Sequence, residues 1–205
     1  MADVTDRKAV KKMIDAAIGA FSSVDILVCN ASARSQKPFT EMTYEEWRRV
    51  IDINLNGTFY CTRAVLRNMV RKRWGRIINI SGGNARNAGN LSGGARNVSL
   101  VHMTKTLATQ VGKFGITVNC IHPGMTRTER TISLMEARGK ELGMSPADAE
   151  AHDFADGSPR TNHINRMVDA SEIGYLTAYL ASDKSWAVTG EVIMAGGGTG
   201  NAVYY

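Results

Sequence analysis

The side chains of this sequence that could do chemistry are concentrated in one glycine- and asparagine-rich stretch, SGGNARNAGNLSGGARN, at residues 81–97. Ser92 and Arg96 are four residues apart, a spacing that places a hydroxyl and a cation on the same face of a helix. Serine is a poor acid and arginine a poor proton donor, so the pair could bind a carboxylate or a phosphate at the helix N-terminus. The simpler alternative is that Ser92 caps the helix.

A serine and a histidine could instead form a hydrolytic pair, in which His122 activates Ser81 or Ser92. No Gly-x-Ser-x-Gly elbow accompanies either serine, and the sequence places no acid beside His122. A structural role for this histidine is therefore the simpler interpretation. His152 and His163 lack the spacing of metal ligands, so the sequence predicts no metal site.

The apolar pattern predicts the elements that must position these side chains. Thr5 or Asp6 should cap the first helix, and Thr43 with Glu46 should form a capping box at the second. Alternating helices and strands predict an α/β fold, with a Rossmann-like doubly wound parallel sheet in a single domain over residues 1–205. The expected helices cover residues 6–21, 43–71, 97–112 and 169–182, and the expected strands cover residues 24–32, 75–81, 116–124 and 190–198.

Ligands of such sheets bind beyond the carboxyl ends of the strands. We therefore expect one crevice lined by residues 30–32, 81–84, 123–128 and 196–198. Residues 125–167 interrupt the alternation with an irregular segment that contains helical patches, and we expect them to form a loop or lid over a substrate.

Composition excludes several classes of function. The 205 residues carry a net charge of +6, but the basic residues are scattered, so no nucleic-acid partner is expected. No apolar run approaches the length of a membrane span, and the N-terminal residues lack the apolar segment of a signal peptide. Cys29, Cys61 and Cys120 are odd in number and far apart, as is typical of reduced thiols. We expect a cytoplasmic protein without a membrane partner.

Several motifs resemble, in their order and spacing, those of the short-chain dehydrogenase/reductase family. They are Cys29-Asn30-Ala31-Ser32, Asn54 within IDINLNGTF, and Pro123-Gly124 followed by Thr128, and the likeness runs from Asp3 to Gly198. The resemblance implies an oxidoreductase that uses NAD or NADP. It implies that Asn54 holds a water and that Ser81 bonds the substrate oxygen. The cofactor contacts that it implies are Asp3, Val4, Asn30, Ala31, Pro123, Gly124 and Thr128.

Two features depart from the family pattern. The family carries a Tyr-x-x-x-Lys pair, and counting back from Thr104 along an uninterrupted helix puts Gly93 and Asn97 at its positions. The family's serine falls at Ser81 or Gly82. In addition, the glycine turn that binds the cofactor diphosphate, and the family's first strands, have no counterpart in this sequence. We expect an N-terminally shortened, catalytically degenerate relative, and the missing turn argues against tight NAD(P) binding.

Without a preceding strand, residues 24–32 would form a sheet edge that is apolar on both faces, and such an edge should pair with something. We therefore expect a homo-oligomer, a dimer or tetramer; the resemblance adds an interface through residues 43–71 and 92–112. Two other functions stay open at this point. One is a cofactor-independent, esterase-like serine hydrolase. The other is a non-catalytic oligomeric module in which Arg86 and Arg96 bind an anion.

Overall fold

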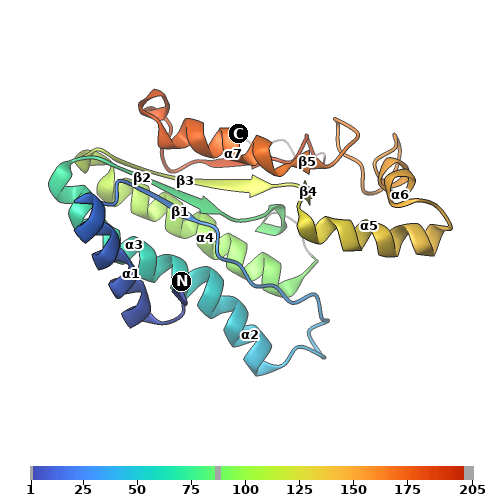
Figure 1. Ribbon diagram of the computed structural model, residues 1–205, viewed down its shortest axis with the longest axis horizontal. Helices are drawn as coiled ribbons and strands as arrows, with labels where there is room; N and C mark the ends of the chain where they lie inside the picture. Colours follow the sequence, from blue (N-terminus) through green and yellow to red (C-terminus); the bar gives the residue numbers. More distant parts are fainter. Residues whose placement is uncertain (1, 86–88, 201–205) are drawn as a thin grey trace. The chain divides into compact units, whose positions relative to one another are not determined.

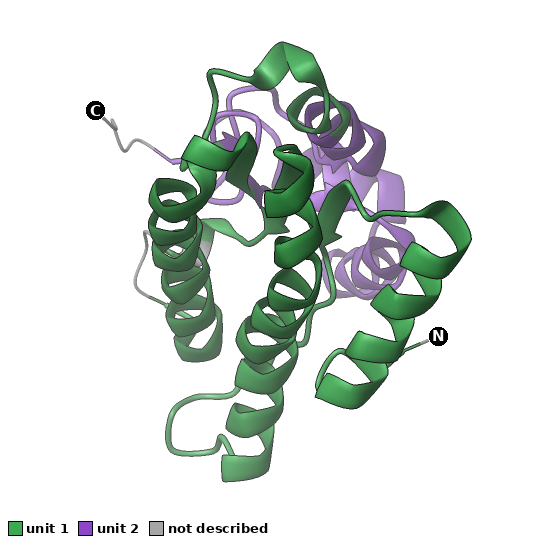
Figure 2. Ribbon diagram, turned by 90° about the vertical axis from the view of Figure 1, so that its left-hand side faces the viewer, with its two compact units in different colours: residues 1–121, 178–193 green, residues 122–177, 194–205 purple. Residues whose placement is uncertain are grey.

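The computed structural model describes residues 2–85 and 89–200, and the chain divides into two compact units (Figure 2). Unit 1 comprises residues Met1–Ile121 and Ala178–Ile193, and unit 2 comprises His122–Thr177 and Met194–Tyr205. The single domain expected over residues 1–205 stays a prediction. Arg86, one of the two arginines of the anion-binding alternative, lies outside the described residues.

A parallel sheet is the centre of unit 1, as the sequence predicted. The strand order is β1-β2-β3-β6, and β1 and β3 both pair in parallel with β2. Cys29 lies opposite Asn79 in the first pair, and Ile80 lies opposite Ile121 in the second. The strands are β1 (Ile26–Cys29), β2 (Gly75–Ile80), β3 (Ile116–Pro123) and β6 (Val192–Ala195).

Strand β1 is the outer strand of this sheet, as expected. Leu27 and Cys29 pack against the core, whereas Ile26 and Val28 on the other face are 45% and 42% exposed. Because its outer edge has no partner among the described strands, β1 leaves one apolar face and one row of backbone groups open.

Three helices cover one face of the sheet: α1 (Arg7–Phe21), α3 (Gly57–Lys72) and α4 (Leu91–Val111) (Figure 1). Val10 of α1, Val65 of α3 and Ile77 of β2 are almost fully buried at the centre of this core. Asp6 is the N-cap of α1, and its side chain accepts a hydrogen bond from the Lys8 N–H, so one of the two expected caps is confirmed.

The helix expected over residues 43–71 is interrupted. It begins with the predicted capping box, in which Thr43 Oγ1 accepts from the Glu46 N–H at 3.1 Å and Glu46 Oε2 accepts from the Thr43 N–H at 3.0 Å. Helix α2 (Tyr44–Ile51) then passes through a π-helical turn (Asp52–Asn56) into α3. Such turns interrupt α-helices mainly at functional sites, and this one contains Asn54.

Unit 2 is more regular than the loop expected over residues 125–167. Met135, Phe154 and Met167 form a small buried core between its helices. Its helices are α5 (Glu129–Leu142), α6 (Pro146–Asp153) and most of α7 (Ala170–Ala181), and its short strands are β4 (Thr126–Arg127) and β5 (Val168–Asp169). The lid function of this segment stays a prediction.

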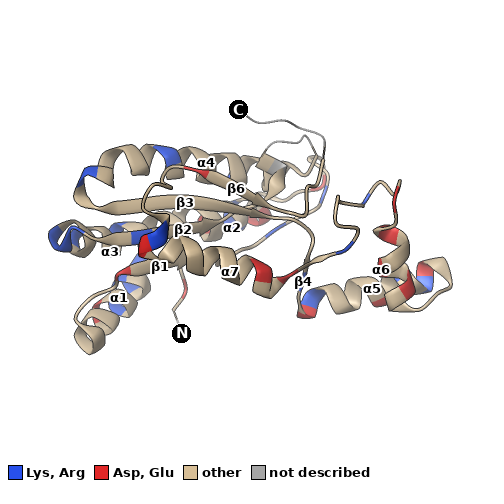
Figure 3. Cartoon of the chain, turned by 90° about the horizontal axis from the view of Figure 1, so that it is seen from above, with Lys and Arg blue, Asp and Glu red and all other residues tan. Residues whose placement is uncertain are grey.

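Charge is distributed as the composition indicated. Figure 3 shows lysine and arginine interspersed with aspartate and glutamate along the helices, without a continuous basic stripe in that view. Within the described ranges, no helix is both long enough and apolar enough to cross a membrane.

Candidate functional site

The candidate site lies at the carboxyl ends of β1 and β2 in unit 1. These strands are parallel and in register, so residues 30–32 and 81–82 leave the sheet at the same edge. Asn30, Ala31 and Ser32 are exposed there. The other two expected segments, 123–128 and 196–198, belong to unit 2. A single crevice lined by all four segments therefore stays a prediction.

Asn54 connects three segments of the site through its side chain. It is 2% exposed, and its Nδ2 donates to the Ala33 carbonyl at 2.8 Å and to the Val50 carbonyl at 2.7 Å. Its Oδ1 accepts a 2.6 Å hydrogen bond from Arg96 Nη1. Both amide protons are therefore used by the protein, and Asn54 joins the loop after β1 to the π-helical turn and to α4. Its implied role of holding a water stays a prediction.

Arg96 is half-buried beside Asn54. Its Nη1 also donates to Ser32 Oγ at 3.2 Å, so one end of the guanidinium is fixed by two partners. Its Nε is buried and has no hydrogen-bond partner among the described residues. Burial lowers the pKa of Arg96, and no carboxylate of the described residues forms an ion pair with it.

The expectation that Ser92 caps α4 is wrong. The cap is Asn90, whose Oδ1 accepts from the Gly93 N–H at 2.6 Å. Ser92 instead lies in the first turn of α4, is fully buried, and donates from Oγ to the Ser35 carbonyl at 2.8 Å. Asn90 Nδ2 donates to the same carbonyl at 2.6 Å. The start of α4 therefore holds the loop that follows β1.

Ser92 and Arg96 do not form one anion site. Ser92 bonds to Ser35, whereas Arg96 bonds to Ser32 and Asn54. Because the Ser92 hydroxyl is 0% exposed and already bonded, it is also unsuited to act as a nucleophile. Of Ser92 and Arg96, only Arg96 has N–H donors that make no hydrogen bond to a described residue, and it bonds to the exposed Ser32.

Helix α4 is continuous from Leu91 to Val111, so the register that places Gly93 and Asn97 one turn apart is valid. Asn97 is 2% exposed, and its Nδ2 lies 3.0 Å from the point that a Cβ on Gly82 would occupy. Asn97 Oδ1 and Ser81 Oγ are buried without a partner in the described part of the chain. No phenol or ammonium group stands at either position of α4.

The residues implied in cofactor binding differ in accessibility. Asp3 is exposed, and its carboxylate accepts from the Thr5 N–H and hydroxyl, which lower its pKa. Val4 packs on Gly57, where a Cβ would lie 2.8 Å from Val4 Cγ2. Asn30 and Ala31 are also exposed, and the implied cofactor contacts of these four residues stay predictions.

In unit 2, the implied residues have clear structural roles. A Cβ on Gly124 would lie 2.6 Å from Gly196 Cα, so the close approach of two backbones requires glycine at this position. Pro123 ends β3, and Thr128 is the N-terminal cap position of α5. Their implied contacts with a cofactor stay predictions.

His122 is fully buried in β3 and belongs to unit 2, whereas Ser81 and Ser92 belong to unit 1. The hydrolytic pair stays a prediction. No group of three or more histidine, cysteine, aspartate or glutamate side chains among the described residues could hold a metal ion.

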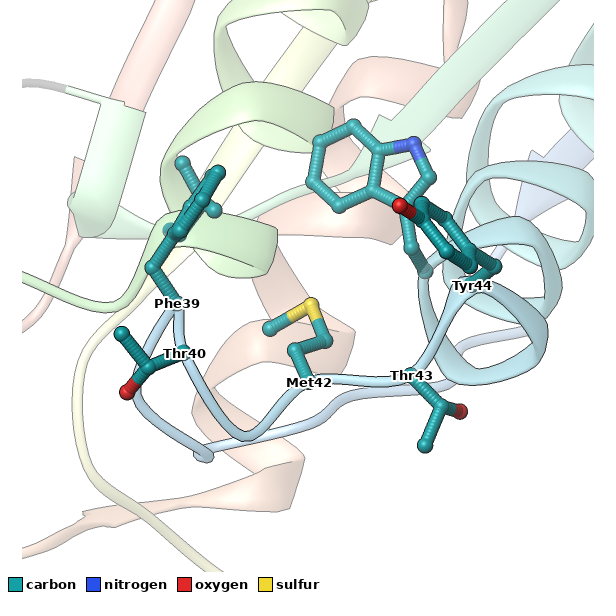
Figure 4. Close-up of a pocket in the computed structure, with 7 residues that line it drawn as sticks. Phe39, Thr40, Met42, Thr43 and Tyr44 are labelled. Carbon is teal, nitrogen blue, oxygen red and sulfur yellow. The ribbon is translucent and has the colours of Figure 1, made fainter.

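A pocket near the start of α4 was missed by the sequence analysis. It has a volume of about 730 Å³, and Phe39, Met42 and Tyr44 point toward its common space (Figure 4). Tyr44 and Phe39 are 90% and 79% exposed, so the pocket offers aromatic surface to an apolar group. The sequence signal that could have predicted this pocket is the group of large side chains just before and within the first turn of α2. The lining residues are Phe39, Thr40, Met42, Thr43, Tyr44, Trp47 and Leu91.

Comparisons with known proteins agree with this geometry. Residues 1–200 match the family model described as enoyl-(acyl carrier protein) reductase. The chain is 34% identical over 201 residues to the 3-oxoacyl-[acyl-carrier-protein] reductase FabG of Escherichia coli (strain K12), covering 97% of this chain and 75% of that relative. It is 32% identical over 203 residues to the (2S)-[(R)-hydroxy(phenyl)methyl]succinyl-CoA dehydrogenase subunit BbsD of Thauera aromatica, covering 97% and 74%.

Solved structures show the same fold. A crystal structure of NAD+-bound xylitol dehydrogenase is similar with a TM-score of 0.81 at 24% identity, covering 96% of this chain and 77% of that one. ElxO with NADP bound is similar with a TM-score of 0.82 at 23% identity, covering 95% and 75%. The Rossmann-like fold is therefore confirmed, and the serine hydrolase alternative is not favoured by these relatives.

Proposed function

The chain belongs to the short-chain dehydrogenase/reductase family of oxidoreductases, and from this membership we propose that it keeps the family's ligand-binding edge but lacks its proton relay. One observation supports the proposal: α4 is continuous from Leu91 to Val111, and counting back along it from Thr104 puts Gly93 and Asn97 where the family has the tyrosine and lysine. Glycine has no proton to give, and a neutral amide supplies no charge to lower the pKa of a phenol. The loss of positioned acid–base catalysis costs about 10²–10⁴ in rate.

One solved neighbour has NAD+ bound and the other NADP, and such a cofactor supplies hydride transfer when bound. In this chain, Asp3, Asn30 and Ala31 are the exposed residues of unit 1 that would contact it. Because the described residues include no glycine turn to hold a diphosphate, we expect weak binding. A calorimetric titration with NADH and NADPH tests this, and micromolar affinity would contradict it.

The catalytic proposal is tested by nucleotide oxidation. The purified chain is mixed with NADH or NADPH and a 3-oxoacyl thioester, the substrate class named in the FabG relatives. We expect no turnover above the reaction without protein. A triple variant, Gly82→Ser with Gly93→Tyr and Asn97→Lys, should gain at least about 10²-fold. The matched control carries Gly93→Phe, which adds the ring without the hydroxyl. Turnover by the unsubstituted chain at the level of the tyrosine variant would refute the proposal.

We also propose a cytoplasmic homo-oligomer. The open edge and exposed face of β1 support association, and a groove of about 460 Å³ between α3 and α4 offers a second apolar surface, which includes Phe59 and Leu66. The three cysteines are free thiols, as is usual in a reducing compartment. Light scattering on the purified chain tests assembly, and a monomer at micromolar concentration would contradict it.

A further inference from the structure

The guanidinium of Arg96 is fixed at one end and unused at the other. Nη1 is held by Asn54 Oδ1 at 2.6 Å and by Ser32 Oγ at 3.2 Å, which sets the plane of the group. Its other edge, formed by Nε and Nη2, makes no hydrogen bond to another described residue, and Nε is buried. A half-buried cation therefore presents two parallel N–H donors that the described protein leaves unsatisfied.

Arg96 differs from the other shielded arginines, which have acidic partners. Arg76 is fully buried and lies 3.2 Å from Asp183, and Arg138 is 19% exposed and contacts Asp153. Burial without a counter-ion is unfavourable for a cation, and it lowers the pKa of Arg96. The residues outside the described ranges, at positions 1, 86–88 and 201–205, include no aspartate or glutamate side chain.

The chain itself contains an example of this guanidinium edge bound to a carboxylate. Arg138 Nε lies 3.1 Å from both carboxylate oxygens of Asp153, and Nη2 lies 3.0 Å from one of them. Nε and Nη2 form a planar fork that matches the two oxygens of a carboxylate, whereas a lysine offers a point charge. The other end of the Arg96 guanidinium, Nη1, bonds to Ser32 at the exposed carboxyl end of β1, and ligands of parallel sheets bind at such strand ends.

We propose that Arg96 binds the carboxylate group of a small-molecule ligand through Nε and Nη2, at the carboxyl end of β1. The ligand carboxylate supplies the missing counter-ion, and Asn54 with Ser32 holds the fork in the receiving orientation. The inference deepens the proposed function, since it assigns a substrate or ligand class to the site that lacks a proton relay. In this proposal Arg96 contacts the ligand directly, whereas Asn54 only positions the guanidinium of Arg96.

The test measures binding of benzoate to the whole chain without nucleotide, by calorimetry and by the ¹⁵N–¹H resonance of Arg96 Nε. We expect benzoate to shift this resonance and benzamide, its neutral counterpart, to leave it unchanged. Arg96→Met and Arg96→Lys should both weaken benzoate binding by at least about tenfold, because each lacks the fork. Arg49→Met, which removes an exposed arginine of α2, is the matched control and should bind normally.

Three results would overturn the inference. One is benzoate affinity that survives in Arg96→Lys, a variant that can still donate to Asn54 and should fold. Another is absence of benzoate binding by the folded chain. The third is inorganic phosphate that binds more tightly than benzoate and depends equally on Arg96, which would make the site a phosphate site. Since no nucleotide is present, each result is independent of the turnover assay, so failure of this inference and failure of the proposed function are distinguishable.

Discussion

Replacing Asn54 with alanine should destabilise the fold far more than a typical surface substitution. The side chain makes three hydrogen bonds, to the Ala33 carbonyl, the Val50 carbonyl and Arg96 Nη1. Net contributions are about 1 kcal/mol for a neutral hydrogen bond and about 1.5–3 kcal/mol for one to a charged group. The loss should therefore lower the free energy of unfolding by about 3–5 kcal/mol. A side chain that only held a water would cost much less.

Urea unfolding followed by tryptophan fluorescence measures this difference. The matched control is Asn68→Ala in α3, because Asn68 is 8% exposed and makes no hydrogen bond to another described residue. The control removes the same atoms, so it should report the packing loss alone, about 1 kcal/mol. Equal losses in the two variants, with unchanged m-values, would refute the view that Asn54 joins three segments of unit 1.

Three further predictions concern other parts of the chain. Arg76→Ala should lower the free energy of unfolding by about 2–4 kcal/mol, because it removes a fully buried side chain that stacks on two tryptophans. Asp183→Asn changes the ion-pair partner of Arg76, which is 84% exposed, and should lower the free energy of unfolding by less in the same urea experiment. A larger loss in Asp183→Asn than in Arg76→Ala would contradict this prediction. Burial, assisted by the neighbouring Cys61, raises the pKa of Cys29 to about 12, so iodoacetamide should label Cys29 at pH near 8 only after urea unfolding; rapid labelling of the folded chain would disprove it. Hydrogen bonds from Arg166 and from the Asp169 backbone lower the pKa of Glu172 from 4.5 to about 2. The contribution of ionised Glu172 to stability is complete above pH 4.5 and is lost as the pH falls toward 2. The difference in free energy of unfolding between the unsubstituted chain and Glu172→Gln should therefore shrink over that range. A difference that stays constant with pH would argue against the ion pair.

The elements of unit 1 could be predicted because local patterns determine them. The helix of residues 7–21 follows from one apolar face and the Asp6 cap, and the capping box of Thr43 and Glu46 follows from their spacing. The edge position of β1 followed from the order of family strands that the sequence resembles. The two caps depend on neighbours within a few residues along the chain, and the edge position depends on the strand order that the family resemblance implies.

The contacts of the site could not be predicted in the same way. Asn90 and Ser92 are both good caps, and both side chains also donate to the Ser35 carbonyl, more than fifty residues away in the sequence. The π-helical turn likewise depends on Asn54 reaching both Ala33 and Arg96. Long-range hydrogen bonds of this kind leave no periodic signal along the chain.

The start of α4 links the proposed loss of the proton relay to the proposed Arg96 site. A relay needs titratable side chains that face the reacting atoms, but here the side chains of Asn90 and Ser92 bond to the loop after β1. Asn97 fits because Gly82 has no Cβ, so these two residues depend on each other. Arg96 is the one cation of this first part of α4, and only its edge formed by Nε and Nη2 is left without a partner among the described residues. The start of α4 therefore holds the loop after β1 and carries the cation of the proposed ligand site.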